Sequence, residues 1–305
     1  MPALLHVLLH GLARVAALAG FVTLALLVSL RMDRVLEPLG RLLLRLPLQA
    51  RVRLPADPIP DWWQDHLAHN VPLVDRLPAD DRERLFRLIQ RFLLDIAFEG
   101  CAGFAITDEV RVTIAAQACL LLLHMPYPRY TRVRRVLVYP STFVPRRIDL
   151  PQTLSIAREA RPALGEAGHS GIVVLSWTAV EAGARNPSDG HNVVVHEFAH
   201  MLDIEDGAFD GTPVLDSPSA YQAWARTFAA RFERHVARAE QGKRSLVSAY
   251  GAENRTEYFA TAVEAFFERP LQLRKTEPDL YAQLAAFFRQ DPATLTAPPD
   301  ASGPA

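Results

Sequence analysis

Apolar residues recur at helical spacing along much of the chain. Between residues 77 and 98 they include Leu85, Leu88, Ile89 and Phe92, which lie three or four positions apart and predict an amphipathic helix. The same pattern predicts further helices over residues 108–124, 217–241, 254–267 and 279–289. We therefore expect a mostly helical protein.

Two shorter stretches have the composition of β-strands. Residues 135–144 and 171–177 are rich in β-branched or aromatic side chains and are bounded by turn-forming residues. They predict a small sheet within an α+β fold. The second strand ends shortly before residues 192–203, so the edge of the sheet is expected beside that segment, where a peptide backbone could add as an extra strand.

The first thirty residues differ from the rest. Residues 11–30 are almost all Leu, Ala, Val and Phe, and twenty helical residues span about 30 Å, the thickness of the hydrocarbon core of a bilayer. Arg14 is the only charged residue among them. Six arginines follow between residues 31 and 53, so the positive-inside rule predicts an inner-membrane anchor with the rest of the chain in the cytoplasm.

Two alternatives to an anchor are open. The apolar segment can be a buried or interfacial helix, or Met32 can be the true start, which would make 1–31 a misassigned extension. Residues 32–60 combine apolar positions at helical spacing with arginines and then prolines, and are interpreted as a basic amphipathic linker. The folded domain is expected over 61–291, followed by a disordered tail, 292–305, rich in Pro, Ala, Ser and Gly.

Composition narrows the classes of function. The chain has 305 residues, half of them hydrophobic, and can bury a large core. Its 33 basic and 34 acidic residues give a formal net charge of −1, so a direct nucleic-acid partner is not expected. Cys101 and Cys119 fit neither a disulfide framework nor a zinc-finger spacing, and are interpreted as buried thiols.

The sequence HEFAH, at residues 196–200, carries the candidate chemistry. On a helix, His196 and His200 lie on one face, where both imidazoles can reach a single ion. A catalytic zinc takes three protein ligands and keeps one position open for water, and Glu197 would lie beside that water as its general base. A hydrogen-bonded pair of structural histidines is the alternative.

The sequence around the motif favours a metal site. The helix expected over 192–203 is mostly apolar, and a buried helix carries two histidines and a carboxylate only when other groups pair with them. Asp189 and Gly190 before the segment and Gly207 after it predict where this helix begins and ends.

The third ligand must come from elsewhere in the chain. No histidine follows His235, so a carboxylate is expected. Glu257 is predicted, because its apolar neighbours would bury its helix against the histidine helix. Glu264, on the same face, is then expected either to hydrogen-bond a ligand side chain or to serve the structure. Asp203 is the rival ligand, but the role we favour for it is to accept a hydrogen bond from a ligand imidazole and fix its tautomer.

Tyr250 is the last candidate. A phenol at the rim of a zinc site can donate a hydrogen bond to the oxyanion of a tetrahedral intermediate. Simple packing, or a hydrogen bond to the backbone, is the alternative role for a single tyrosine.

Several blocks, in order, resemble one known family. They are HEFAH with Leu202-Asp203, then Tyr250-Gly251, then EYFA at 257–260 with Glu264 and Phe266-Phe267, together with upstream stretches at 70–73 and 115–121. From about residue 62 to 292 the chain is similar to the Mlc titration factor A family of zinc peptidases. The resemblance implies one zinc per chain held by His196, His200 and Glu257, with Glu197 as base and Tyr250 as a partner of the transition state.

The resemblance also implies a fold and an activity. The expected fold is a compact mixed α/β zincin body, similar around its metal to the anthrax lethal factor type. Members of the family act as cytosolic aminopeptidases, and some bind the glucose repressor Mlc and relieve its repression. The hydrophobic segment at the start of the chain departs from that pattern.

These observations lead to three alternative hypotheses for the function. The first is a zinc metallopeptidase, aminopeptidase-like, that hydrolyses peptides. The second is a regulatory protein that binds a transcriptional repressor, with the zinc site secondary. The third is a purely structural metal site, which predicts four protein ligands and no open position.

Overall fold

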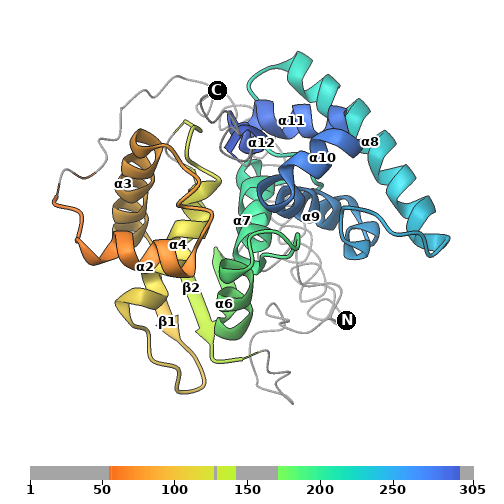
Figure 1. Cartoon of the computed structure of the whole chain (residues 1–305). Coiled ribbons are helices and arrows are strands. Elements are labelled where there is room, and N and C mark those ends of the chain that lie inside the picture. The colour runs from red at the N-terminus through yellow and green to blue at the C-terminus, as the bar shows by residue number, and fades with distance from the viewer. Residues whose placement is uncertain (1–54, 56, 127–128, 142–170, 296–305) are drawn as a thin grey trace, which may run out of the picture. The chain divides into compact units, whose positions relative to one another are not determined.

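The computed structural model describes residues 55, 57–126, 129–141 and 171–295 (Figure 1). These residues are mostly helical. The helices are α2 (Trp62–Asn70), α3 (Ala79–Asp95), α4 (Asp108–Leu120), α6 (Trp177–Arg185), α7 (Val193–Asp203), α8 (Pro218–Glu240), α9 (Arg255–Glu268), α10 (Pro270–Thr276), α11 (Pro278–Phe288) and α12 (Pro292–Leu295), with the short 3-10 helices η1 (Ile204–Asp206) and η2 (Ala249–Ala252). The strands are β1 (Ala97–Gly100), β2 (Arg135–Tyr139) and β3 (Ile172–Ser176).

The three strands form a parallel sheet in the order β1-β2-β3. Ala97 pairs with Arg135, and Arg135 pairs with Ile172, which sets the register of the sheet. Parallel neighbours need a long connection, and α4 lies in the one from β1 to β2. Within the described part of the chain β3 is an edge strand, and it packs against α6 and α7. The predicted α+β fold, with a small sheet beside the HEFAH helix, is confirmed.

The structure corrects the prediction of one helix over residues 77–98. The helix α3 ends at Asp95, and Ile96 is already extended, with φ −119° and ψ 125°. The next four residues form β1 because their backbone pairs with β2, a contact that helical periodicity cannot reveal. Three further helices, α2, α6 and α10, were not predicted from the sequence.

The expected tail also needs a correction. Residues 292–295 form the short helix α12, and both Pro292 and Ala293 are buried. The hydroxyl group of Tyr281 on α11 accepts a hydrogen bond from the backbone N–H of Ala293, at 3.0 Å, which ties this turn to the C-terminal helices. The rest of the predicted tail lies outside the described residues.

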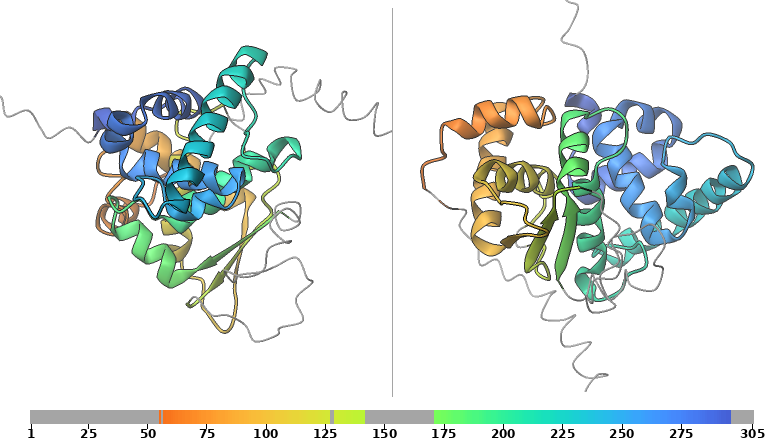
Figure 2. Two further views of the ribbon diagram at one scale, coloured as in Figure 1. Left: turned by 90° about the vertical axis from the view of Figure 1, so that its right-hand side faces the viewer. Right: turned by 90° about the horizontal axis from the view of Figure 1, so that it is seen from below.

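The helix α7 is packed on several sides. It contacts α4, α6, β3 and α9, and Figure 1 and the right-hand view of Figure 2 show it between the sheet with its helices and the C-terminal helices. Phe198 is fully buried, and its ring lies 4.9 Å from that of Tyr130 and 5.5 Å from that of Phe92, measured between centroids. The motif-bearing helix is thus fixed by the hydrophobic core.

The described helices include none with the length and apolar character needed to cross a bilayer. The predicted anchor, residues 11–30, and the predicted linker apart from its last few residues lie outside the described part of the chain.

Replacing Phe198 with Ala should lower the free energy of unfolding by about 3–5 kcal/mol, because a large buried ring is lost and its cavity only partly closes. The measurement is urea denaturation followed by tryptophan fluorescence. Leu94→Ala is the matched control, since Leu94 is 70% exposed and should change stability by less than about 0.5 kcal/mol. Equal effects of the two substitutions would contradict the central place given to Phe198.

Candidate metal centre

The helix α7 begins at a local cap. The side-chain oxygen of Asn192 accepts a hydrogen bond from the backbone N–H of Val195 at 3.0 Å, which satisfies one of the free N–H groups of the first turn. Asp189, expected near the start, instead accepts from the backbone N–H of His191, at 2.9 Å. At the other end η1 continues the chain to Gly207, whose φ of +92° suits glycine, as predicted.

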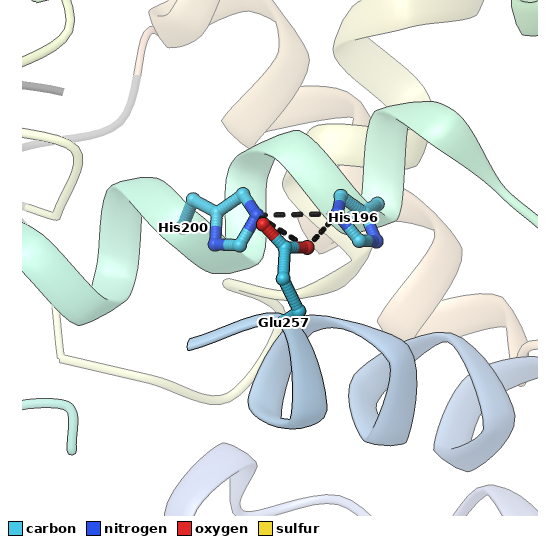
Figure 3. A group of neighbouring side chains, drawn as sticks. All are labelled: His196, His200 and Glu257. Atoms are coloured by element: carbon cyan, nitrogen blue, oxygen red, sulfur yellow. Dashed lines mark hydrogen bonds and ion pairs between the residues drawn. The ribbon is translucent and has the colours of Figure 1, made fainter. Parts of the chain in front are cut away.

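His196 and His200 project from one face of α7 toward Glu257 on α9 (Figure 3). The His196 Nε2 atom lies 3.1 Å from both His200 Nε2 and Glu257 Oε2, and His200 Nε2 lies 3.5 Å from the same carboxylate oxygen. His200 and Glu257 are buried, and His196 is half-buried. These three residues form a group that can hold a metal ion.

The geometry of this group fits a tetrahedral divalent ion. Metal–ligand bonds of 2.0–2.2 Å place neighbouring tetrahedral ligands roughly 3.3–3.6 Å apart, close to the separations found here. The second carboxylate oxygen of Glu257, Oε1, is buried without a hydrogen-bond partner among the described residues. A buried carboxylate in that state needs a compensating positive charge, and a metal ion would supply it. No fourth metal-binding side chain joins the group within the described residues.

Local structure positions Glu257. It lies in the first turn of α9, where the side chain of Asn254 caps the helix by accepting a hydrogen bond from the backbone N–H of Glu257 at 2.9 Å. Burial by itself raises the pKa of Glu257, but its hydrogen bonds with His196 and His200 outweigh burial and lower the pKa below its ordinary value. The carboxyl group is therefore ionised and ready to act as a ligand.

Glu264, two turns further along α9, contacts the other side of the His196 ring. Its Oε1 atom is 2.8 Å from His196 Nδ1, and its Oε2 accepts a hydrogen bond from the backbone N–H of Asn192 at 2.6 Å. A proton on Nδ1 leaves Nε2 free to bind a metal. Burial lowers the pKa of His196, but the hydrogen bonds with Glu257 and Glu264 raise it well above the ordinary value, so this place favours positive charge.

Glu268 continues the row of carboxylates on α9 and was missed by sequence reasoning. Its Oε2 atom accepts hydrogen bonds from the backbone N–H groups of Gly190 and His191 at 2.9 and 3.0 Å. It therefore holds the segment just before α7. The available signal was its position four residues after Glu264, on the same helix face. Burial raises the pKa of Glu268 to about 8.

The structure corrects the role predicted for Asp203. Its Oδ2 atom accepts a hydrogen bond from the backbone N–H of Gly211 at 3.0 Å, and within the described residues it has no hydrogen bond with either imidazole. Asp203 is fully buried, which raises its pKa to about 7. The hydrogen bond that orients a ligand imidazole comes from Glu264 instead, because Glu264 on α9, and not Asp203 at the end of α7, lies beside the Nδ1 atom of His196.

Glu197 and Tyr250 lie near the group and are both partly exposed. Glu197 is half-buried, and its charge acts on both His196 and Tyr250. The Tyr250 ring, in η2, lies 5.9 Å from the His196 ring between centroids and is 37% exposed. Burial, then the charges of Glu257 and Glu253 and a hydrogen bond with Glu257, raise the pKa of Tyr250, so its hydroxyl group keeps its proton.

Two histidines one turn apart, a glutamate beside the first and another glutamate from a later helix define a metallopeptidase-like centre. Comparison with known proteins agrees with this class. The family of glucose-regulated metallo-peptidases M90 matches residues 46–289, and the chain belongs to that family. The resemblance to the Mlc titration factor A family, drawn from the sequence, is confirmed.

Individual relatives extend over most of the chain. An uncharacterized protein of Synechocystis sp. is 36% identical over 236 residues, which cover 77% of this chain and 86% of the relative. A protein of Salmonella gallinarum called Mlc titration factor A is 29% identical over 240 residues, covering 76% of this chain and 88% of the relative. The protein of the same name from Salmonella typhimurium is 28% identical over a segment of the same length.

The raised pKa of Glu268 makes stability depend on pH. Between pH 4.5 and about 8 the folded protein retains a proton that the unfolded chain has lost, so this group makes the free energy of unfolding fall as pH rises. Glutamine cannot ionise, and its oxygen can accept the same two backbone hydrogen bonds. Glu268→Gln should therefore gain stability relative to the parent protein as pH rises through this window, by at most a few kcal/mol.

The measurement is urea denaturation of both proteins at pH 5, 6.5 and 8, with equal metal content. Glu240→Gln at the exposed end of α8 is the control and should show no such trend. A stability difference between Glu268→Gln and the parent that stays constant with pH would refute this account of Glu268.

Proposed function

We propose that the protein is a zinc-dependent peptidase in which His196, His200 and Glu257 hold the metal. The observation that carries the proposal is the convergence of two imidazole nitrogens and one carboxylate oxygen, 3.1–3.5 Å apart, with Glu197 beside them. Two histidines and a glutamate are a donor set of catalytic zinc sites, and imidazole suits zinc well. A zinc ion held there would supply Lewis-acid chemistry, polarising a carbonyl group and making water more acidic.

Three residues around the metal group take part in the proposed reaction. Glu197 removes a proton from the attacking water and delivers it to the leaving amine, as a general base and then a general acid. Tyr250, which keeps its proton, donates a hydrogen bond to the oxyanion that forms on the scissile carbonyl. Glu264 holds His196 in the tautomer that leaves Nε2 free.

The strand β3 offers a way to hold a peptide. It is one of the two edge strands of the described sheet, and it packs against α7, the helix with both histidines. A peptide that adds to this edge makes backbone hydrogen bonds that do not depend on its side chains. Sequence-tolerant binding of short peptides follows, with specificity left to nearby pockets.

Replacement of Glu197 with Gln tests the mechanism. The change removes the base but none of the ligands, so peptide hydrolysis should fall roughly 100- to 10,000-fold while one zinc per chain is retained. Turnover is measured on blocked internally quenched peptides and on amino-acid p-nitroanilides, with zinc determined by mass spectrometry. Activity on the p-nitroanilides alone would identify an aminopeptidase, which is the activity that the family resemblance implies.

Two controls make this result specific. Glu181→Gln makes the same chemical change on α6, where Glu181 is half-buried and pairs with Arg185 rather than with a residue of the metal group, and it should leave turnover intact. Chelation of zinc should abolish activity of the parent protein, and added zinc should restore it. Undiminished turnover by Glu197→Gln would exclude this residue as the base.

A second candidate function is binding of a transcriptional repressor, with the metal site secondary. It is favoured by the name of several relatives, Mlc titration factor A. The test is the affinity for a repressor of the Mlc type, measured for the parent protein and for His196→Ala/His200→Ala. Equal affinities would separate binding from the metal centre, whereas absence of binding by the folded parent protein would eliminate this function.

A further inference from the structure

A cavity of about 390 Å³ is lined by residues that adjoin Tyr250 and the start of α7 in the sequence. Its walls are the C-terminal end of α8, the loop at 242–249 and the segment before α7. Ala249 in its wall immediately precedes Tyr250, and His191 in the opposite wall immediately precedes Asn192, the cap of α7. Both walls of the cavity are therefore continuous in the chain with segments that carry residues of the candidate site.

Positive charge dominates the lining of this cavity. Lys243, Arg244 and Arg269 line it, and none of their charged groups forms an ion pair among the described residues. Asp189 is the one acidic side chain in the lining, and it is already engaged by the Asn186 amide at 2.7 Å and by the backbone N–H of His191 at 2.9 Å. Three cations without carboxylate partners leave a local excess of positive charge.

Local packing gives the cavity a defined shape. The stem of Arg269 crosses Gly190, where an added Cβ atom would lie 3.1 Å from its Cδ, and the φ of +81° at Gly190 also favours glycine. This contact places the Arg269 side chain against the segment that precedes α7. The guanidinium is thereby held near the wall of the cavity, with less freedom than a fully exposed arginine has.

The opposite wall is fixed by His235. This buried imidazole donates from Nε2 to the backbone oxygen of Ser248 at 2.9 Å and accepts from the Ser245 hydroxyl group at Nδ1, at 3.3 Å. Burial lowers the pKa of His235, so it is neutral and adds no charge. His235 thus connects α8 to the segment that leads into Tyr250.

We propose that this cavity binds a carboxylate group of the peptide substrate, with Arg269 and Lys243 as its main recognition groups. The inference rests on the proposed peptidase function and extends it to substrate class. Guanidinium groups bind carboxylates through paired hydrogen bonds, and a site with excess cations selects an anionic group over its amide. The carboxylate is either the free C-terminus of a short peptide or an Asp or Glu side chain.

The test compares peptides that differ only in this group. The first comparison is between tetraalanine with a free C-terminus and the same peptide with an amidated C-terminus. The second is between amidated tetrapeptides that carry either Glu or Gln, placed at each position in turn. For the parent protein, kcat/KM should be higher for the carboxylate member. In Arg269→Met, which keeps a long apolar stem across Gly190, that preference should fall roughly tenfold, mainly through KM.

Matched variants make the result specific to charge in the cavity. Arg269→Lys should retain part of the preference, and Lys243→Met should reduce it. Arg226→Met removes the same charge from an exposed site on α8, roughly 20 Å along the helix from the cavity, and should leave the preference intact. A preference for the free C-terminus alone, or for Glu alone, identifies the source of the carboxylate.

Binding measurements separate this inference from the peptidase proposal. Affinities of fluorescent forms of the same peptides are measured by anisotropy for the parent protein and for Arg269→Met. A carboxylate preference that Arg269→Met loses supports the cavity site even if no peptide is hydrolysed, in which case only the peptidase proposal fails. Hydrolysis or binding without any carboxylate preference, or a preference that Arg269→Met retains in full, overturns the inference.

Discussion

The packing of α9 against α7 is the contact on which the rest of the site depends. Carboxylates of α9 meet polar groups of α7 at three levels. Glu257 meets both imidazoles, Glu264 meets His196 and the backbone of Asn192, and Glu268 meets the backbone just before the helix. One buried interface therefore sets the position and rotation of the motif-bearing helix and the protonation of His196.

Such an interface is costly unless its charges balance. Burial opposes ionisation of Glu257 and Glu268, and the Oε1 atoms of both lie buried without hydrogen-bond partners among the described residues. A proton on His196 supplies part of the missing positive charge, and a divalent ion in the same place would supply more. The polar groups are held together by apolar packing around Phe198, which leaves α7 little freedom to move away.

In the proposed peptidase, access of a substrate would depend on elements outside that interface. The strand β3 lies beside α7, and η2 places Tyr250 near His196. The segment of η2 is held tightly, because a Cβ atom on Gly251 would lie 2.4 Å from the hydroxyl oxygen of Thr261. Rigid placement of this kind is what the proposed function requires, because a phenol and a neighbouring basic cavity would have to meet defined parts of a bound peptide.

Features that depend on near neighbours in the chain could be predicted from the sequence. The spacing of His196 and His200 follows from helical periodicity, and apolar spacing locates most of the long helices. Sequence reasoning favoured Glu257 as the third ligand over Asp203, but the contacts of Glu257 and Glu264 with His196, which lies 61 and 68 residues away, are set by the packing of α9 against α7. Tertiary contacts also give Asp203 a hydrogen bond from the backbone of Gly211 and pair residues 97–100 with β2 as a strand. Those outcomes rest on the relative placement of distant elements, which local periodicity does not encode.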